Sequence, residues 1–410
     1  MNNINPASEF VEFQCKNCDA RLKVPAASAA AGAKCPRCEI VNQVDMSASP
    51  MESVAPVIAA DTASPQSQTT PAHPLDDTET VASVPQEIVG RDTPTRQLYE
   101  KITDEVAKVL VGQEELVQGT LVALFSGGHV LIESVPGLGK TLFVRTLGRI
   151  LGCEFGRIQF TADLMPSDVT GAPIFDMKTQ EFNFRPGPVF TQLLLADEIN
   201  RSPAKTHAAL LEIMQEKNVT VDGTTHELAP PFIVMATQNP IESEGTYNLP
   251  EAQLDRFMFK LFADYPSEQD EAKILTLHGS QQDLDDRLEK DVRQVTTPEE
   301  INKITNENSD VRVDPVLVNY INKIVRLTRS WPAFYMGASP RAGISLIQGA
   351  RTLAAFSGRD YAVPDDVVHI ALPTLRHRVM LTAEAEVEGQ NVDQLLGDLL
   401  RTIAVPRINN

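Results

Sequence analysis

The sequence predicts an α/β fold built on a parallel β-sheet, followed by a helical domain and preceded by a small cysteine-rich module on a linker. Short apolar runs alternate with helical stretches between residues 93 and 265, which is the pattern of a parallel sheet with crossover helices. After Pro266 the strand-like runs stop and helical stretches follow. We therefore expect an α/β core over residues 93–265 and a helical domain over residues 266–405.

The composition is typical of a globular protein and disfavours general nucleic-acid binding. Of 410 residues, 42% are hydrophobic and 22% are charged, and the formal net charge is −19. DNA is a polyanion, and proteins bind it largely by neutralising phosphates with lysine and arginine. No apolar run approaches the roughly 18 residues of a membrane helix, and the opening stretch MNNINPASEF lacks the features of a secretory signal. We expect a cytoplasmic protein.

Residues 9–45 contain two Cys-x-x-Cys pairs that are separated by sixteen residues. This spacing is typical of a closed site in which four thiolates bind one zinc ion. The alternative is a redox-active or unmetallated cysteine cluster. We expect a zinc-ribbon-like module with a structural Zn²⁺ held by Cys15, Cys18, Cys35 and Cys38.

Residues 46–92 are predicted to form a disordered linker between this module and the core. Residues 46–90 contain no Lys, Arg, Phe, Tyr or Trp and carry six prolines. Such a segment cannot bury enough apolar surface to offset the entropy lost on ordering.

A phosphate-loop motif follows the first apolar strand of the core. The stretch ESVPGLGKT, residues 133–141, matches the pattern G-x-x-x-x-G-K-[ST], except that Ser134 occupies the first glycine position. A strand precedes it and a helix follows, so backbone N–H groups and the positive end of the helix dipole would face phosphates. The alternative is a plain glycine-rich turn. The expected nucleotide-binding residues of the loop are Pro136, Gly137, Leu138, Gly139, Lys140, Thr141 and Leu142.

Polar residues at the ends of two further strands would complete a nucleotide site. The run LLLADE ends in Asp197, which is expected to hold Mg²⁺ together with Thr141, and in Glu198, which is expected to activate the attacking water. The run IVMATQNP places Asn239 where it could orient that water. Taken alone, the first run could be a capped turn and the second an ordinary Asn-Pro turn.

Two arginines are candidates for stabilising the charge that develops on a transferring phosphoryl group. Arg256 lies in EAQLDRF, just before the last predicted strand, and Arg341 lies in GASPRAG, at the start of a predicted helix. Each could instead be an ordinary surface or ion-pairing arginine, which is the commoner case.

Together these motifs resemble those of the MoxR-type AAA+ ATPases, over roughly residues 95–400. The resemblance is carried by the runs FTADLMPSDVTG, FRPGPVFTQLLLADEINRSPAKTHAALLEIMQE and PFIVMATQNPIESEGTYNLPEAQLDRF. It implies an AAA+ P-loop NTPase core with a C-terminal α-helical lid. It also implies a β-hairpin insertion over GAPIFDMKTQEFNFRPGP and a second hairpin over NVTVDGTTHEL.

The resemblance further implies residue roles and partners. Asn239 matches the first sensor, Arg256 the arginine finger and Arg341 the second sensor, and Val111 and Gly112 lie where the adenine pocket begins. Because the finger acts on the neighbouring subunit's ATP, a homo-oligomeric ring, expected to be a hexamer, is implied. Relatives act as chaperone-like machines, often alongside proteins with von Willebrand factor type A domains. The cysteine module departs from the usual family core.

We therefore expect Mg²⁺-dependent ATP hydrolysis coupled to remodelling or maturation of a client protein. Two alternatives stay open. One is a nucleic-acid-associated AAA+ protein that uses the zinc ribbon as a DNA reader, which the acidic composition disfavours. The other is a non-hydrolysing, nucleotide-gated scaffold, for which Ser134 is the only hint.

Overall fold

The chain divides into two units, Met1–Val84 and Pro85–Asn410. The computed structural model describes residues 90–135, 137–239, 247, 249–279 and 284–406, together with four short strands near the N-terminus. Most of the predicted linker lies outside these described residues, and so do the four N-terminal cysteines.

Two short hairpins are described in the first unit. Strand β1 (Phe10–Gln14) pairs antiparallel with β2 (Arg21–Pro25), and β3 (Ala33–Lys34) pairs antiparallel with β4 (Val41–Asn42). In the sequence, one Cys-x-x-Cys pair falls between β1 and β2 and the other between β3 and β4.

The second unit is built on the predicted parallel sheet, in which five strands are ordered β13-β5-β12-β9-β6. The order of the strands along the chain reverses on the two sides of β5, and ligands of open α/β sheets bind beyond the carboxyl ends of the strands at such a reversal. The strands are β5 (Val130–Ser134), β6 (Phe155–Gln159), β9 (Leu193–Asp197), β12 (Ile233–Gln238) and β13 (Phe259–Ala263).

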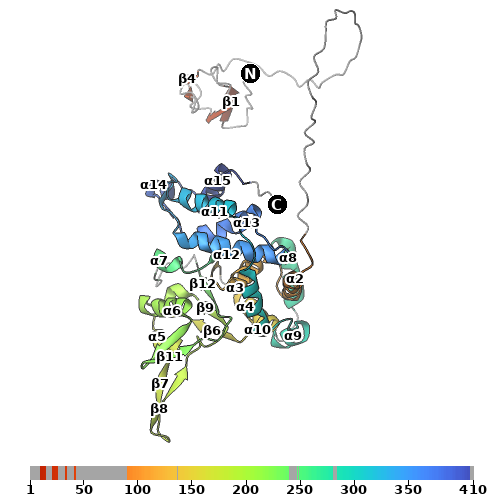
Figure 1. The fold of residues 1–410 in the computed structure, drawn as a ribbon. Helices are drawn as coiled ribbons and strands as arrows, with labels where there is room; N and C mark the ends of the chain where they lie inside the picture. Colours follow the sequence, from red (N-terminus) through yellow and green to blue (C-terminus); the bar gives the residue numbers. More distant parts are fainter. Residues whose placement is uncertain are drawn as a thin grey trace, which may run out of the picture. The chain divides into compact units, whose positions relative to one another are not determined.

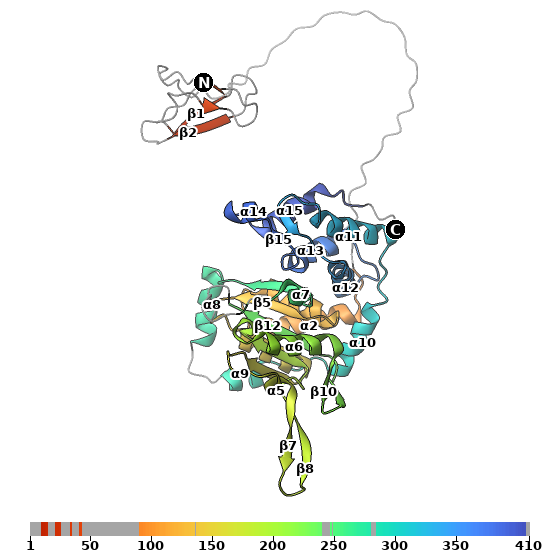
Figure 2. The same ribbon diagram turned by 90° about the vertical axis from the view of Figure 1, so that its left-hand side faces the viewer.

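Helices cover both faces of this sheet (Figure 2). Alternation along β9 shows the two faces, because Leu193 and Leu195 belong to one hydrophobic cluster while Leu194 and Ala196 belong to another. Strands buried on both faces read as continuous apolar runs, which is why the sequence predicts them well. The first cluster includes α2 (Pro94–Ala107), α3 (Glu114–Phe125) and α4 (Lys140–Leu151), and the second includes α5 (Pro166–Thr170) and α6 (Ala204–Glu216).

The C-terminal part of the chain is mainly helical, and α11, α12 and α13 lie together beyond one side of the sheet (Figure 1). Its hydrophobic residues join the first cluster of the core without a break, so the boundary at residue 266 stays a prediction. The helices are α8 (Glu268–His278), α9 (Leu284–Asp291), α10 (Pro298–Asn308), α11 (Pro315–Thr328), α12 (Pro340–Phe356), α13 (Pro364–Leu375), α14 (Ala383–Val387) and α15 (Val392–Thr402).

The expectation that strands end at Pro266 is wrong in one detail. Strand β14 (Phe334–Met336) pairs antiparallel with β15 (Met380–Leu381) inside the helical part. These strands have three and two residues, which is too short for hydrophobic alternation to mark them in a sequence. Among the described residues, no helix is long and apolar enough to cross a membrane.

Two antiparallel hairpins lie outside the five-stranded sheet, and the sequence predicts both. One consists of β7 (Gly171–Asp176) and β8 (Glu181–Pro186), the other of β10 (Asn218–Val221) and β11 (Thr224–Glu227). The β7–β8 hairpin projects away from the rest of its unit (Figures 1 and 2).

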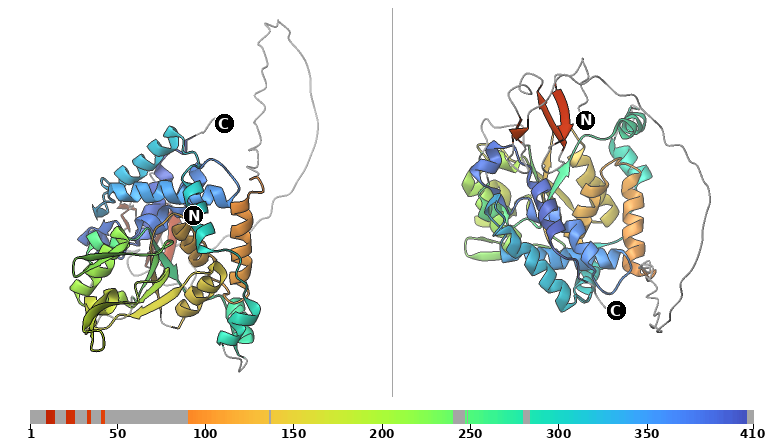
Figure 3. Two further views of the ribbon diagram at one scale, coloured as in Figure 1. Left: turned by 60° about the horizontal axis from the view of Figure 1, so that its bottom comes forward. Right: turned by 90° about the horizontal axis from the view of Figure 1, so that it is seen from above.

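Helix α2 lies beside the helices that begin the C-terminal part, as both views of Figure 3 show in orange and teal. A carboxylate oxygen of Glu105 in α2 accepts a hydrogen bond from the backbone N–H of Arg293 at 3.0 Å. The loop between α2 and α3, residues 108–113, is therefore held close to this junction.

Candidate nucleotide-binding site

The phosphate loop joins the end of β5 to the start of α4. Gly137 and Gly139 have φ angles of +87° and +74°, a left-handed conformation that glycine adopts with little strain. Ser134 is the last residue of β5, pairs with Ala263 of β13 and is buried. The serine therefore sits in ordinary extended backbone, and the departure from the glycine pattern imposes no strained conformation. Pro136 lies outside the described residues.

The first turn of α4 faces the loop without a capping side chain. Gly139 is the N-cap residue, so no side chain accepts a hydrogen bond from the helix's first N–H groups. Such groups, with the positive end of the helix dipole, form an anion site. Lys140 and Thr141 are the first two residues of the helix and are half-buried. The arrangement can hold a phosphate chain with a lysine and a hydroxyl beside it.

Asp197 ends β9 at the same edge of the sheet and is fixed from two neighbouring strands. The Thr237 hydroxyl of β12 donates to Asp197 Oδ1 at 2.6 Å, and Arg157 Nη2 of β6 lies 2.7 Å from Asp197 Oδ2. The Thr237 hydroxyl also accepts a hydrogen bond from the Glu198 N–H at 2.8 Å. Sequence reasoning did not identify Arg157 or Thr237; the parallel register of β6, β9 and β12 is what brings them to the aspartate.

Glu198 follows in a left-handed conformation, with φ of +56°. Non-glycine residues adopt this conformation rarely, and it is concentrated at functional sites. Gln159 Nε2, at the end of β6, donates to Glu198 Oε2 at 2.7 Å, and Arg201 Nε lies 3.3 Å from the same oxygen. Arg201 belongs to a short 3₁₀ helix (Ile199–Arg201) that leads into α6.

Asn239 follows the last residue of β12 and is buried. Because β12 lies between β5 and β9 in a parallel sheet, its carboxyl end lies between the phosphate loop and Asp197. The structure therefore places Lys140, Thr141, Asp197, Glu198 and Asn239 at one edge of the sheet. A carboxylate next to a phosphate site can hold a metal ion or accept a proton from water.

The loop predicted to begin the adenine pocket lies between α2 and α3. Gly112 has φ of +74°, and a Cβ atom at this position would lie 3.1 Å from Cβ of Asp270 in α8. Gly112 also lines a hollow of about 340 Å³ together with Tyr99 and Leu110. The loop is thus packed against the first helix of the C-terminal part.

Arg256 and Arg341 do not lie at the edge of the sheet that holds the phosphate loop and Asp197. Both line a hollow of about 250 Å³ that also contains His129 and Met258. His129 and Met258 immediately precede β5 and β13, and the Met258 N–H donates to the His129 carbonyl at 2.7 Å. The hollow is therefore at the amino edge of the sheet, and five residues of strand, about 15 Å, separate it from the phosphate loop.

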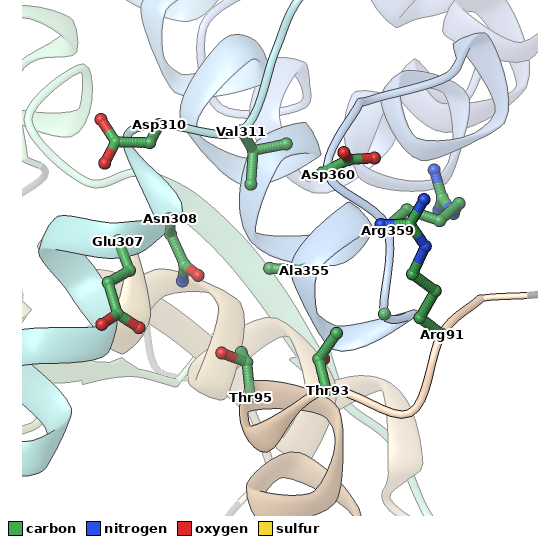
Figure 4. A pocket seen from close by; sticks show the side chains of 11 residues that line it. Arg91, Thr93, Thr95, Glu307, Asn308, Asp310, Val311, Ala355, Arg359 and Asp360 are labelled. Carbon is green, nitrogen blue, oxygen red and sulfur yellow. The ribbon is translucent and has the colours of Figure 1, made fainter.

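Another hollow, of about 240 Å³, lies where the described chain enters the second unit (Figure 4). Side chains of both signs line it, including Arg91 and Arg359 with Glu307, Asp310 and Asp360. Arg359 Nη2 also forms a 2.6 Å ion pair with Asp366. Because side chains of both signs line it, this hollow does not select one class of charged ligand.

Among the described residues, no group of three or more His, Cys, Asp or Glu side chains is arranged to hold a metal ion. This observation does not test the predicted zinc site, because its four cysteines lie outside the described residues. The remaining cysteine, Cys153, is a buried free thiol whose pKa is raised to about 12 by burial. A thiol with so high a pKa is an unreactive apolar side chain.

Comparison with known proteins first shows the broad class of proteins to which this chain belongs. Residues 129–259 match the ATPase family associated with various cellular activities (AAA), and residues 326–399 match the AAA lid domain. A solved structure from Cytophaga hutchinsonii, described as a "putative ATPase", superposes with a TM-score of 0.70 and 40% identity, over 76% of this chain and 96% of that one. The chain is an ATPase of the AAA+ class.

Individual relatives show to which family within this class the chain belongs. It is 43% identical over 321 residues to chaperone MoxR1 of Mycobacterium tuberculosis, covering 76% of this chain and 83% of that protein. It is 46% identical over 309 residues to YeaC of Bacillus subtilis, covering 75% of this chain and 95% of that one. This chain belongs to the MoxR family.

Proposed function

We propose that this chain is a ring-forming, Mg²⁺-dependent ATP hydrolase that uses ATP turnover to remodel or mature a client protein. The observation that carries the proposal is the meeting of the phosphate loop and the Asp197–Glu198 pair at one edge of the parallel sheet. The same edge holds the buried Asn239.

The side chains at this edge fit a magnesium nucleotide. Oxygen atoms are the ligands that Mg²⁺ prefers, and the Thr141 hydroxyl and the Asp197 carboxylate would hold the ion. A bound Mg²⁺ supplies positive charge against the phosphate oxygens. Lys140 would contact the β- and γ-phosphates, and Val111 and Gly112 would border the adenine. In this structure Arg157 forms an ion pair with Asp197. Arg157 would stay beside the Asp197 carboxylate when that carboxylate binds Mg²⁺.

Glu198 is the general base of this proposal. Its carboxylate accepts hydrogen bonds from Gln159 and lies beside Arg201, so it must turn from Gln159 to accept a proton from the attacking water. Asn239 would orient that water. Gln159 would thereby restrain the base until nucleotide is bound.

The position of Arg256, the proposed arginine finger, supports a ring. Arg256 lies at the amino edge of the sheet, about 15 Å from the phosphate loop of its own chain. It can act on ATP only if that ATP is bound to a neighbouring copy. Arg341 lines the same hollow, so we assign it to the neighbour's nucleotide as well. A homo-oligomer, expected to be a hexamer, places the amino edge of each copy against the carboxyl edge of the next.

The β7–β8 hairpin is the candidate client-binding element. It projects from its unit (Figure 2), and Met177 and Phe182 are 86% and 70% exposed. The rings of Phe175 and Phe182 lie 5.2 Å apart. Exposed, clustered apolar side chains mark interaction sites on proteins. The relative from Mycobacterium tuberculosis is named a chaperone, and a von Willebrand factor type A domain protein is the partner class that the family resemblance suggests.

A double substitution in this hairpin tests the client proposal. We expect the full-length protein to suppress aggregation of a heat-unfolded model enzyme in an ATP-dependent manner, measured by light scattering. Replacing Phe175 and Phe182 by serine should remove that suppression and leave ATP turnover unchanged, because both side chains belong to the hairpin that projects away from the rest of its unit (Figure 2). Val387→Ser, which removes a side chain that is 89% exposed in the lid, is the matched control. A wild-type protein without ATP-dependent suppression would contradict client remodelling.

We further propose that Cys15, Cys18, Cys35 and Cys38 hold one structural zinc ion. Support comes from the two hairpins of the first unit, because each Cys-x-x-Cys pair lies between their paired strands. Such loops can direct two thiolates toward one metal. A closed site of this kind stabilises a small fold and recognises a partner rather than performing catalysis.

Metal analysis tests the zinc site. We expect about one zinc per chain in the protein purified without added metal, and a loss of most of it in the Cys15→Ser/Cys18→Ser variant. Cys153→Ser, which changes the buried cysteine, should keep the metal. A metal-free protein whose N-terminal cysteines are disulfide-bonded would favour the redox alternative and refute the zinc site.

A further inference from the structure

The hollow at the amino edge of the sheet contains more positive charge than the two arginines supply. Lys217, His129 and Arg378 line it together with Arg256 and Arg341, and no Asp or Glu residue is among its lining residues. The chain as a whole carries a net charge of −19. A concave surface of one sign on a protein of the opposite sign attracts a ligand of complementary charge, so this hollow is suited to an anion.

Two of the five basic side chains serve the fold. His129 is fully buried between Val234 N–H, which donates to its Nδ1 at 3.0 Å, and the Met214 carbonyl at 3.0 Å from Nε2. Burial lowers its pKa to about 4, so the ring is neutral. Arg378 forms a 2.8 Å ion pair with Asp255 and is almost completely buried.

The other three cations are available to a ligand. Arg256 Nη1 donates to the neutral carbonyl of Leu211 at 2.8 Å, which leaves its charge uncompensated. Arg341 and Lys217 are exposed. Within the described part of the chain, no ion pair neutralises any of the three. By contrast, the hollow in Figure 4 is lined by side chains of both signs, so an excess of positive charge is not shared by every hollow of the described residues.

The backbone of Lys217 is held in a conformation that favours glycine. Lys217 is the C-cap of α6 with φ of +54°, and most helices that end in this way use glycine or asparagine there. Its N–H donates to the Ile213 carbonyl at 2.8 Å and its carbonyl accepts from Leu228 N–H at 3.0 Å. The chain keeps a lysine at a strained position that is fixed on both sides, where glycine would serve the fold better.

Helix α6 separates Lys217 from the nucleotide of its own chain. The helix has thirteen residues, or about 20 Å at 1.5 Å per residue. Glu198 and the 3₁₀ helix precede its first turn, and Lys217 follows its last. The anion that Lys217 meets must therefore come from outside its own active site.

We propose that Lys217 is a third phosphate-binding cation of the subunit interface, which contacts the γ-phosphate of ATP bound to the neighbouring copy together with Arg256. The ammonium group would stabilise negative charge on the transferring phosphoryl group. This inference rests on the proposed ring, and the experiment is chosen so that the two can fail separately.

Single substitutions in the full-length protein come first. Lys217→Gly should lower ATP turnover at least about tenfold while the melting temperature stays equal or rises, because glycine relieves the left-handed strain. Nucleotide binding by dilute subunits should not change, since Lys217 is remote from their own site. Lys217→Arg should retain most turnover. Lys303→Ala, at a lysine that is 74% exposed on α10, is the surface control and should behave as wild type.

Mixed oligomers then identify the subunit on which Lys217 acts. A subunit with Lys217→Gly keeps its own Glu198, and a subunit with Glu198→Gln keeps its own Lys217. Mixing the two should restore turnover above either protein alone, because some interfaces then combine an intact base with an intact lysine. Mixing Lys217→Gly with Arg256→Ala should not restore it, because both changes are on the same side of the interface.

Each outcome decides the inference. Wild-type turnover by Lys217→Gly overturns it, as does a loss that mixing with Glu198→Gln does not restore, which would mean that the lysine acts within its own subunit. If the Arg256→Ala and Glu198→Gln proteins also fail to complement each other, the ring proposal itself is refuted. Restoration by Glu198→Gln and not by Arg256→Ala supports the assignment.

Discussion

Replacing Glu198 by glutamine is expected to lower ATP turnover by about a hundredfold to ten-thousandfold while ATP binding is kept. Glutamine has nearly the same shape but cannot accept a proton from the attacking water. Lys140 and Thr141, on the phosphate side of the site, are unchanged. Turnover is measured as steady-state phosphate release, and binding by titration with a fluorescent ATP analogue.

Two further variants make this result specific. Glu212→Gln makes the same chemical change at an exposed position of α6 and should leave both quantities unchanged. Lys140→Ala should lose binding as well as turnover, since the loop lysine is the only cation of the phosphate loop. Phosphate release by Glu198→Gln at the wild-type rate would remove Glu198 as the base. Persistent inactivity of the wild-type protein with Mg²⁺ and ATP would instead favour a nucleotide-gated scaffold.

The parts of the site that the sequence predicts are those that depend on local pattern. The phosphate loop is one continuous stretch between a strand and a helix, so its glycines, Lys140 and Thr141 can be placed from spacing alone. Asp197 and Glu198 end an apolar run, and a run of this kind indicates a central parallel strand. The sequence shows that Ser134 replaces the first glycine of the motif, but it does not show whether the serine backbone is strained. The pairing of Ser134 with Ala263 in the sheet shows that it is not.

The residues that sequence reasoning missed depend on register between strands that are distant in the chain. Arg157 and Gln159 lie two residues apart in β6. They contact Asp197 and Glu198, respectively, only because β6 pairs with β9. No local motif marks either residue. The grouping of Arg341 with Arg256 is of the same kind, since it requires the packing of α12 near the amino ends of β5 and β13.

Helix α6 connects the two edges of the sheet, which gives the proposed ring a physical route between neighbouring sites. At one end it follows Glu198, and at the other it ends at Lys217. The guanidinium of Arg256 donates a hydrogen bond to the carbonyl of Leu211, which belongs to the same helix α6. In the proposed ring, a shift of Glu198 on ATP binding would therefore move cations that face the next nucleotide.

Replacing Arg256 by alanine should lower ATP turnover about a thousandfold or more, which is the usual contribution of an arginine finger. ATP binding to the subunit's own site should stay the same, because the arginine and the phosphate loop lie at opposite edges of the sheet. Turnover per subunit of the wild-type protein should also rise with protein concentration as subunits assemble. Both are measured by phosphate release, with assembly followed by light scattering on a sizing column.

A structural explanation of that loss has to be separated from a catalytic one, because Arg256 also donates to the Leu211 carbonyl. Arg256→Gln keeps an amide donor for this carbonyl but has no charge, so it should keep the melting temperature of the wild type and still lose turnover. Mixing Arg256→Ala with Glu198→Gln should restore part of the activity that neither has alone. An Arg256→Gln protein with full turnover would show that the guanidinium serves only to hold α6, and the carboxyl edge would then have to hydrolyse ATP without a neighbour.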